Sequence, residues 1–379
     1  MKILHVISNL GIGGAEIFLK NLIASWPSKS DQHYVISFHN GEVADALRQS
    51  GISVEILLTS GSTSIFFFGA AFWQLSKKID EIEPDVVVSS LWAANIICRM
   101  LCFSKKIPSF SILHNNTSFL GFFKKYLDVA TLFAFQGTAV AVSHSVKKSY
   151  QELFIFGGSL KKKIKVIQNG VDVDRLVAGL EQNSLRHHFG LHRRVFVFGA
   201  VGRLIPSKGF KNLILAFNRF LQENFEDIQD DELKPMLCIV GDGPEREFLK
   251  KMVEDLVLKK HVIFCGNQSK VEQLYYGFSS YISSSVNEGQ SLALLEAMAI
   301  GLPVIVTSAS EGELFTCDLD GIVLESGEIA EIAFGMLKMY TEYQLFAPHA
   351  KKRSLAIRAC YSIARTAEEY ASFILDLMG

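Results

Sequence analysis

The sequence predicts an α/β protein with two Rossmann-like domains, each built on a doubly wound parallel sheet. Apolar runs of strand length alternate with segments of helical periodicity along the whole chain. The alternation stops near residue 175 and then starts again. The length of 379 residues is too great for one small domain and fits two of ordinary size.

The first series of elements begins with a strand at Lys2–Ser8 and a helix at Gly14–Ser25, where Ile17 and other apolar residues have helical spacing. Further strands are expected at Tyr34–Phe38, Val54–Leu58, Asp85–Ser89, Pro108–Leu113, Thr138–Val142 and Lys165–Ile167. Asp85–Ser89 reads Asp-Val-Val-Val-Ser, which is typical of a strand buried on both faces of a parallel sheet. The turn signal Asn169-Gly170 ends the series.

The second series repeats the pattern. Strands are expected at Phe196–Val201, Met236–Val240, Val262–Phe264, Tyr281–Ser283 and Val304–Val306, and helices at Asn212–Glu223, Glu245–Val257, Gln290–Ala299 and Glu328–Leu377. We therefore expect domains at residues 1–172 and 173–360, with a C-terminal helix at 361–379 that packs back on the first domain. In sheets of this kind ligands bind at the carboxyl ends of the strands, so the site is expected in a cleft between the two halves.

The charge of the chain is unevenly distributed. The formal net charge is −1, so no bulk attraction to nucleic acid is expected. Residues 1–170 hold 17 Lys and Arg against 11 Asp and Glu, a net of +6, whereas residues 171–379 hold 21 against 28, a net of −7. The two halves therefore suit different partners.

Compartment and membrane signals are few. None of the 6 cysteines forms a C-x-x-C pair, which favours reduced thiols in a cytoplasmic protein. The start of the chain is expected to be a first strand and not a signal peptide. The most apolar window, Ile65–Trp73, is about half the ~20 residues that span a bilayer, which leaves a buried helix or a partly exposed surface that touches lipid.

A glycine-rich loop, Gly11–Ala15, follows the first strand and opens a helix. Glycines let the backbone approach a ligand, and a helix N-terminus favours an anion. Glu16 stands where the dinucleotide fingerprint needs glycine, and the chain has no P-loop motif. A mere tight turn is the alternative.

Two cations follow the first strand of the second half. Arg203 and Lys208 stand on a loop bounded by Gly202 and Gly209, where they could grip a diphosphate. Solvated surface charge is the alternative. The segment Gly241–Glu245 ends another strand and is expected to be a strand-to-helix turn with Pro244 at the helix start.

Two carboxylates, Glu288 and Glu296, are separated by seven residues, which suits different parts of one extended ligand better than a common metal. Glu296 lies among apolar residues of a helix, so a hydroxyl or cationic partner is expected. Free N–H groups of Gly289, Gln290 and Ser291 at the helix start could hold phosphate or sugar oxygens. Exposure of both carboxylates to solvent is the alternative. His114 ends a strand and points towards the cleft, and a purely structural role is the alternative.

These segments together resemble retaining glycosyltransferases of the GT-B fold, specifically glycosyltransferase family 4. The resemblance is carried by five motifs in the family's order: Gly13–Glu16, Asn169–Asp172, Gly202–Leu204 with Lys208-Gly209, Gly241–Pro244, and Glu288-x7-Glu296 followed by Ala297-Met298-Ala299. It covers nearly the whole chain.

The resemblance implies a role for each matching residue. Arg203 and Lys208 would bind the donor diphosphate and stabilise the leaving group. Glu288 would contact the donor sugar and Glu296 the ribose hydroxyls. Gly13 and Gly14 would approach the phosphate and acceptor, His114 would lie near the donor sugar, and Gly289, Gln290, Ser291 and Leu292 would complete the donor site.

No metal or other cofactor is expected, because cations and helix N–H groups can neutralise the diphosphate. The Asp172-Val173-Asp174 stretch is interpreted as an interdomain turn. The resemblance implies transfer of a hexose or N-acetylhexosamine from an NDP-sugar, with UDP favoured over GDP, to a glycan or polyprenyl-diphosphate-linked acceptor in surface polysaccharide assembly. A non-hydrolysing UDP-sugar epimerase and a non-catalytic sugar-nucleotide-binding subunit are the alternatives.

The basic first half combines lysine clusters with apolar runs. Lys105-Lys106, Lys124-Lys125 and Lys161–Lys163 lie near Ile65–Trp73 and Phe119–Phe123. Basic and apolar surface together suit an anionic membrane. We therefore expect residues 1–170 to carry membrane affinity and the protein to be peripheral on the inner face of the cell membrane.

Overall fold

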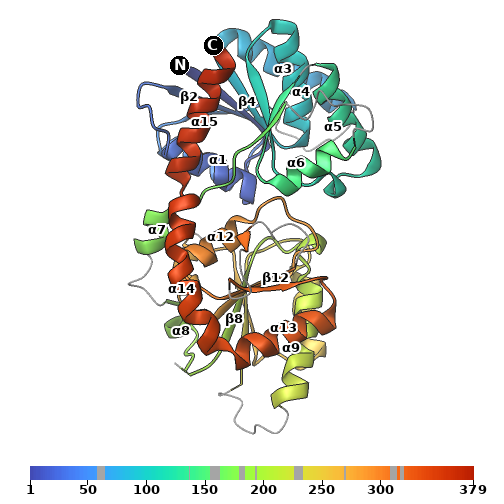
Figure 1. The fold of residues 1–379 in the computed structure, drawn as a ribbon. Coiled ribbons are helices and arrows are strands. Elements are labelled where there is room, and N and C mark those ends of the chain that lie inside the picture. Colours follow the sequence, from blue (N-terminus) through green and yellow to red (C-terminus); the bar gives the residue numbers. More distant parts are fainter. Residues whose placement is uncertain are drawn as a thin grey trace. The chain divides into compact units, whose positions relative to one another are not determined.

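The computed structural model describes residues 1–57, 65–135, 137–153, 163–178, 184–192, 194–225, 234–268, 270–307, 314–315 and 320–379, with the side chains at 65, 66, 119 and 184 left aside. The chain forms two compact units (Figure 1). Unit 1 comprises residues 1–170 and 363–379, and unit 2 comprises residues 171–362. Each unit contains one parallel sheet, so the predicted fold of two Rossmann-like domains is confirmed.

Unit 1 is built on a 7-stranded sheet with the order β3-β2-β1-β4-β5-β6-β7. Its strands are β1 (Lys2–Asn9), β2 (Gln32–His39), β3 (Ser53–Ile56), β4 (Val86–Ser90), β5 (Ser109–Leu113), β6 (Thr138–Ala141) and β7 (Ile164–Val166). Every neighbouring pair is parallel. All residues of β4 are buried, as the β-branched run predicts. The order reverses between β1 and β4, and ligands bind at such a switch point in open α/β sheets.

The helices of unit 1 cover both faces of this sheet. They are α1 (Gly14–Ala24), α2 (Glu42–Gln49), α3 (Ile65–Ile82), α4 (Trp92–Lys105), α5 (Phe122–Ala134), α6 (His144–Gln151) and α15 (Ile363–Met378). One core cluster joins Leu4 and Val6 of β1 to α3 and α4, and another joins Ile7 to α1 and α2. Helix α15 packs against α1 and β5 through Tyr370 and Phe373, so the last helix is part of this unit.

Helix α3 contains the most apolar window of the chain. It buries Phe67 and Ala71 but exposes 68% of Trp73, so one face is core and the other is open to solvent. In the described part of the chain, no helix is both long enough and apolar enough to cross a bilayer.

Unit 2 is built on a 6-stranded sheet with the order β10-β9-β8-β11-β12-β13. Its strands are β8 (Val197–Val201), β9 (Met236–Val240), β10 (Val262–Gly266), β11 (Ser280–Ser283), β12 (Val304–Thr307) and β13 (Ile322–Leu324). All pairs are parallel. Along β9, Leu237 and Ile239 face one core cluster while Cys238 and Val240 face the other, which is the period of two expected for a strand buried on both sides.

The helices of unit 2 are α7 (Val173–Ala178), α8 (Ser184–His188), α9 (Phe210–Phe225), α10 (Arg246–Asp255), α11 (Val271–Tyr275), α12 (Leu292–Ala299), α13 (Ile329–Thr341) and α14 (Tyr343–Cys360). The tail expected as one helical stretch is divided into α13, α14 and α15. The expected start of α10 at Glu245 with Pro244 is wrong by a residue or two, because Glu245 is the N-cap and Arg246 the first helical residue.

The chain passes between the units at two points in the sequence, after Gly170 and after Ser362. Within unit 2 the two passages are neighbours: Val171 and Ser362 form a parallel bridge, and the Val171 N–H donates to the Tyr361 carbonyl at 2.8 Å. Within unit 1 the Thr366 hydroxyl donates to the Gln168 carbonyl at 3.1 Å. The expected interdomain turn at Asp172–Asp174 is the start of α7, where Asp172 Oδ1 accepts the Arg175 N–H at 3.0 Å.

Candidate functional site

Most predicted donor-site residues lie on two loops at the carboxyl edge of the unit 2 sheet. The strand order reverses between β8 and β11, so these neighbouring strands lead to helices on opposite faces. The loop 202–209 follows β8, and the loop 284–291 follows β11. The predicted residues therefore meet at the switch point where open α/β sheets bind ligands.

The two loops are held together by hydrogen bonds to the backbone carbonyls of the first loop. The Ser284 hydroxyl donates to the Lys208 carbonyl at 2.8 Å, and the Val286 N–H donates to the Ser207 carbonyl at 2.9 Å. Gly209 has a φ of +69°, and a Cβ there would lie 2.1 Å from the Ser284 carbonyl oxygen. Only glycine permits this approach, which fixes Lys208 beside the loop that carries Glu288.

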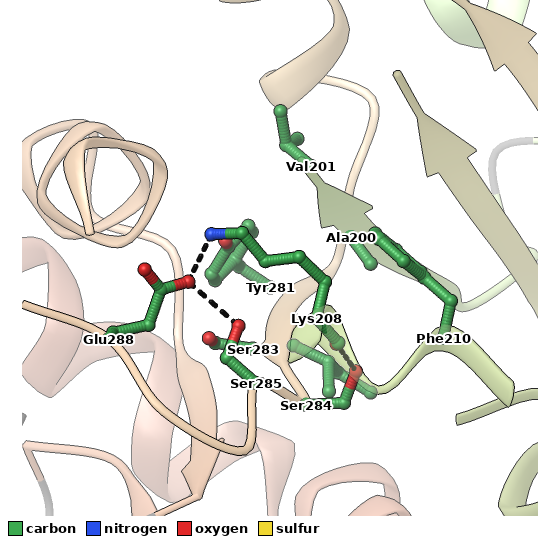
Figure 2. Close-up of a pocket in the computed structure, with 10 residues that line it drawn as sticks. Ala200, Val201, Lys208, Phe210, Tyr281, Ser283, Ser284, Ser285 and Glu288 are labelled. Carbon is green, nitrogen blue, oxygen red and sulfur yellow. Dashed lines mark hydrogen bonds and ion pairs between the residues drawn. The ribbon is translucent and has the colours of Figure 1, made fainter. Parts of the chain in front are cut away.

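Lys208 and Glu288 form an ion pair across the two loops (Figure 2). Their side chains are 24% and 13% exposed, and the Ser285 hydroxyl also donates to Glu288 Oε1 at 2.8 Å. They line a pocket with an empty volume of about 220 Å³ together with Ala200, Val201, Phe210, Tyr281, Ile282, Ser283, Ser284 and Ser285. Lys208, predicted to bind the diphosphate, and Glu288, predicted to contact the sugar, are thus direct neighbours. A ligand that binds Lys208 would have to replace Glu288 as its partner.

Arg203 lies on the same loop as Lys208 but its side chain is exposed. Among the residues that the structure describes, no carboxylate forms an ion pair with it. The guanidinium thus remains open to an anion that reaches this edge of the sheet.

The start of helix α12 presents backbone donors towards the same edge. The predicted start at Gln290 is two residues early, because Leu292 is the first helical residue and Ser291 is the N-cap. The Ser291 hydroxyl accepts the Leu294 N–H at 3.3 Å, which satisfies one of the free donors of the first turn. Gly289 and Gln290 precede this N-cap, with a bend at Gly289.

Glu296 has both of the partner types expected for it. Its Oε1 accepts from Arg175 Nη2 at 3.0 Å, and its Oε2 accepts from the Tyr275 hydroxyl at 2.9 Å. Burial raises the pKa of Glu296, and the Arg175 cation and the Tyr275 hydrogen bond oppose that rise. The carboxylate is therefore held by α7 and α11 at a fixed place inside the unit.

The sequence alone did not identify Arg175 and Tyr275. Arg175 stands 121 residues from Glu296 along the chain, and Tyr275 stands 21 away. The only sequence signal for Arg175 is that it follows the motif Asn169–Asp172 by three residues.

The Gly241–Glu245 segment supports the neighbouring loop. Gly241 has a φ of +131°, and a Cβ there would lie 2.0 Å from the Gly202 carbonyl oxygen. The Leu204 N–H donates to the Asp242 carbonyl at 2.9 Å. The structural interpretation of this segment as a turn holds, and its function is to hold the loop that carries Arg203.

The remaining predicted residues lie in unit 1, at the carboxyl ends of β1 and β5. His114 Nε2 lies 3.4 Å from the Ser90 hydroxyl, and the His114 ring packs edge-on against Phe18 of α1 at 5.9 Å. Burial lowers the pKa of His114 to about 4, so the imidazole is neutral near pH 7. It can donate and accept hydrogen bonds there, and it carries no charge.

The glycine loop of unit 1 ends at the N-cap of α1, Gly13, with Gly14 as the first helical residue. A Cβ on Gly13 would lie 2.5 Å from Glu16 Oε2, so the chain's own carboxylate lies beside this turn. Gly14 has open space around it. Gly13, Gly14 and His114 belong to one unit and the other predicted residues to the other, so the cleft that would join them stays a prediction.

Comparison with known proteins gives two family matches. The family described as glycosyltransferase family 4 matches residues 12–175, and the family described as glycosyl transferases group 1 matches residues 182–354. The chain is 27% identical over 219 residues to an Escherichia coli UDP-Gal:alpha-D-GlcNAc-diphosphoundecaprenol alpha-1,3-galactosyltransferase, covering 57% of this chain and 55% of that protein.

A second relative matches over most of both chains. It is the lipopolysaccharide core biosynthesis glycosyltransferase LpsD of Rhizobium meliloti, 25% identical over 89% of this chain and 88% of its own. By contrast, the matches to the E. coli enzyme and to two uncharacterized Methanocaldococcus jannaschii glycosyltransferases span only 55%, 59% and 61% of those proteins.

Solved structures share the fold. The Anabaena protein HepE in complex with UDP-glucose superposes with a TM-score of 0.85 at 22% identity, covering 99% of this chain and 100% of that one. WaaG, a glycosyltransferase involved in lipopolysaccharide biosynthesis, gives a TM-score of 0.77 at 15% identity, covering 98% and 99%. The two family matches together cover most of the chain, the first mainly in unit 1 and the second in unit 2, and the chain belongs to glycosyltransferase family 4 with a GT-B fold.

Proposed function

We propose that this protein transfers a hexose or N-acetylhexosamine from a UDP-sugar to a glycan or lipid-linked acceptor, with retention of the anomeric configuration. The observation that carries the proposal is the meeting of Lys208 and Glu288 at the switch point of unit 2. A cation for phosphate and a carboxylate for sugar hydroxyls are thereby side by side, as a sugar diphosphate requires. The relatives named for galactosyl transfer to a lipid diphosphate and for lipopolysaccharide core synthesis support this substrate class.

The donor diphosphate would take Lys208 from Glu288. The phosphate oxygens would accept hydrogen bonds from Lys208, Arg203 and the N–H groups at the start of α12. Glu288, no longer paired with Lys208, would accept hydrogen bonds from the sugar. Glu296, fixed by Arg175 and Tyr275, would accept hydrogen bonds from the ribose hydroxyls. These contacts hold the leaving group in a site where fixed charges need no rearrangement during the reaction.

In the proposed reaction the bond from the anomeric carbon to the diphosphate oxygen breaks, and its electron pair leaves with UDP. The acceptor hydroxyl attacks the same face of the sugar and passes its proton to a donor phosphate oxygen. Lys208 and Arg203 neutralise the charge that develops on the leaving group, so the proposal is metal-independent. Neutral His114 would hydrogen-bond the donor sugar, and Gly13 and Gly14 would let the phosphate and acceptor approach the backbone of unit 1.

We place the protein in the cytoplasm, peripheral to the inner face of the membrane, where lipid-linked acceptors are available. The basic character of residues 1–170 supports this placement. An anionic surface attracts such a segment through its lysines at moderate ionic strength.

The test is a panel of NDP-sugars with the full-length protein. Thermal shift would identify the binding donor, and turnover with lipid-linked acceptors in the presence of EDTA would follow release of the nucleoside diphosphate. NMR of the product would report the anomeric configuration. Clean conversion of UDP-GlcNAc to its epimer without acceptor would replace the transferase by an epimerase. Unchanged cellular function with Arg203→Ala and Lys208→Ala would favour a non-catalytic binding subunit.

A further inference from the structure

Helix α5 exposes four aromatic rings and buries two polar side chains. Its buried face carries the apolar Val129 and Leu132 together with Asp128 and Thr131, which are 2% and 7% exposed. Its outer face carries Phe122, Phe123, Tyr126 and Phe133, which are 80%, 75%, 46% and 56% exposed. A helix on the surface of a globular protein normally turns such aromatic residues inwards.

The orientation of α5 is fixed by a buried polar network. Arg99 of α4 donates to Asp128 Oδ1 at 2.5 Å and to the Thr131 hydroxyl at 3.1 Å. The Tyr150 hydroxyl of α6 donates to Asp128 Oδ2 at 2.6 Å. Turning the helix over would leave a buried arginine without its carboxylate, and breaking such a buried pair costs about 3–5 kcal/mol. The outward face is therefore a property of the folded unit.

Helix α4 extends the same surface. The Trp92 indole donates to the Lys124 carbonyl at 2.9 Å near the first turns of both helices, and the rings of Phe103 and Phe135 lie 5.6 Å apart near their last turns. The two helices therefore run side by side in the same direction. Phe103, 51% exposed, adds to the four rings of α5. We call Phe103, Phe122, Phe123, Tyr126 and Phe133 the aromatic face.

Charge at both ends of the aromatic face has one sign. Lys124 and Lys125 lie at the start of α5, and Lys105 and Lys106 lie at the end of α4. Lys105 is paired with Asp80 of α3, whereas Lys106, Lys124 and Lys125 form no ion pair with a described residue. Asp128 is the only Asp or Glu between residues 92 and 135, and it is buried.

We propose that the aromatic face docks on the surface of an anionic lipid bilayer. Aromatic rings settle at the boundary of headgroups and acyl chains, and lysines at both ends pair with anionic headgroups. Between residues 92 and 135 every charged side chain that is not buried is a lysine, and Asp80 of α3 neutralises only Lys105. This excess of positive charge suits anionic headgroups better than a partner protein or a second copy of this chain, whose surfaces carry both signs. The loop 114–121 joins His114 to α5, so docking would bring the bilayer to the chain segment next to the proposed sugar site; this advantage rests on the proposed function.

The first test removes the rings. Vesicles of phosphatidylglycerol and phosphatidylethanolamine, with phosphatidylcholine vesicles as the neutral comparison, are sedimented with the full-length protein at low salt. The double variant Phe122→Ser/Phe123→Ser is expected to lose at least about tenfold in partitioning, because two insertable rings are gone. The matched control Phe248→Ser/Phe334→Ser removes two rings of unit 2 that are 50% and 64% exposed, and it is expected to bind like the wild type.

The second test reverses the charge. Lys124→Glu/Lys125→Glu is expected to lose more than about tenfold, since each basic residue near an anionic surface contributes a factor of about five. The control Lys351→Glu/Lys352→Glu changes the net charge of the protein by the same amount, at an exposed lysine pair on α14 of unit 2. Equal binding of the α5 variants and their controls would overturn the proposal.

Other occupants give other results. A wild-type dimer in solution that the Phe122→Ser/Phe123→Ser variant converts to a monomer would assign the face to a second copy and overturn lipid docking. Absence of wild-type binding to anionic vesicles would also overturn it, even if the protein binds UDP and turns over donor. Vesicle binding without turnover of any NDP-sugar would instead sink the proposed function and leave the docking surface standing.

Discussion

At the scale of single residues, the ion pair of Lys208 and Glu288 determines how the donor can enter. Glu288 neutralises the lysine that we assign to the diphosphate, so nucleotide and carboxylate compete for one ammonium group. The Ser285 hydroxyl remains as a partner for Glu288 after the exchange.

This competition predicts opposite effects of two substitutions. Lys208→Ala should lower kcat/KM by about 10²–10³, the usual loss when a charge-stabilising donor is removed. Glu288→Gln should lower turnover but keep or strengthen the affinity for UDP alone, because Lys208 no longer has a competing carboxylate. Isothermal titration with UDP and steady-state rates measure both. Lys211→Ala, an exposed lysine three positions away on α9, is the control and should behave as wild type. Weaker UDP binding in Glu288→Gln would contradict the competition.

Arg175 gives a prediction about pH. Burial raises the pKa of Glu296 and Arg175 opposes the rise, so loss of Arg175 should raise that pKa further. Donor binding needs the ionised carboxylate, so it weakens as pH falls through this pKa. The acid limb of 1/KM for the donor should therefore move to higher pH in Arg175→Ala and return towards the wild-type position in Arg175→Lys. A donor lacking ribose hydroxyls should show no such shift, and an unmoved limb with the natural donor would exclude this role.

At the scale of elements, the contact between the loops after β8 and β11 depends on one glycine. Gly209→Ala combines a positive φ with a Cβ 2.1 Å from the Ser284 oxygen, whereas Gly190 has a φ of +60° and open space around it. Gly190→Ala should cost about 1 kcal/mol of unfolding free energy for strain alone. Gly209→Ala should cost above about 3 kcal/mol and abolish UDP binding. Urea unfolding followed by far-ultraviolet circular dichroism compares the two, and equal costs would contradict this account.

The elements also show where sequence reasoning works. β9 lies at the predicted Met236–Val240, because an apolar run bounded by Pro235 and Gly241 leaves little freedom. β13, only three residues long, is the one strand of the described sheets that the sequence analysis missed. The partner types of Glu296 followed from the cost of burying a charge, but their identities did not, because α7 and α11 reach α12 only through the tertiary fold. The exposed aromatic face of α5 was also not predicted, because Asp128 looks like a surface residue until Arg99 is seen opposite it.

At the scale of the molecule, unit 1 should be sensitive to acid. Burial lowers the pKa of His33 and His114 to about 4 and that of His5 well below its usual value. The unfolded chain therefore binds more protons between pH 6.5 and 4, and stability falls as pH drops through this range. His33 and His114 each contribute a loss of about 2 kcal/mol at pH 5, and His5 contributes in the same direction.

Tryptophan fluorescence is suited to this measurement, because Trp26, Trp73 and Trp92 are the 3 tryptophans of the chain and all lie in unit 1. Urea unfolding of the wild type at pH 7 and pH 5 should show the loss. His33→Gln should reduce it by about one histidine's share. An equal loss in both proteins would show that His33 is not a source of the acid sensitivity.

The two neighbouring passages between the units also dictate an order of assembly during synthesis. Residues 363–379 supply α15, whose Tyr370 and Phe373 pack on rings of α1 and β5. A ribosome makes these residues only after all of unit 2, although most of unit 1 was made first. Unit 2 can thus close while it is being translated, whereas unit 1 must wait with Phe18 and Phe110 uncovered. During that interval the nascent first half is the part that chaperones would need to shield.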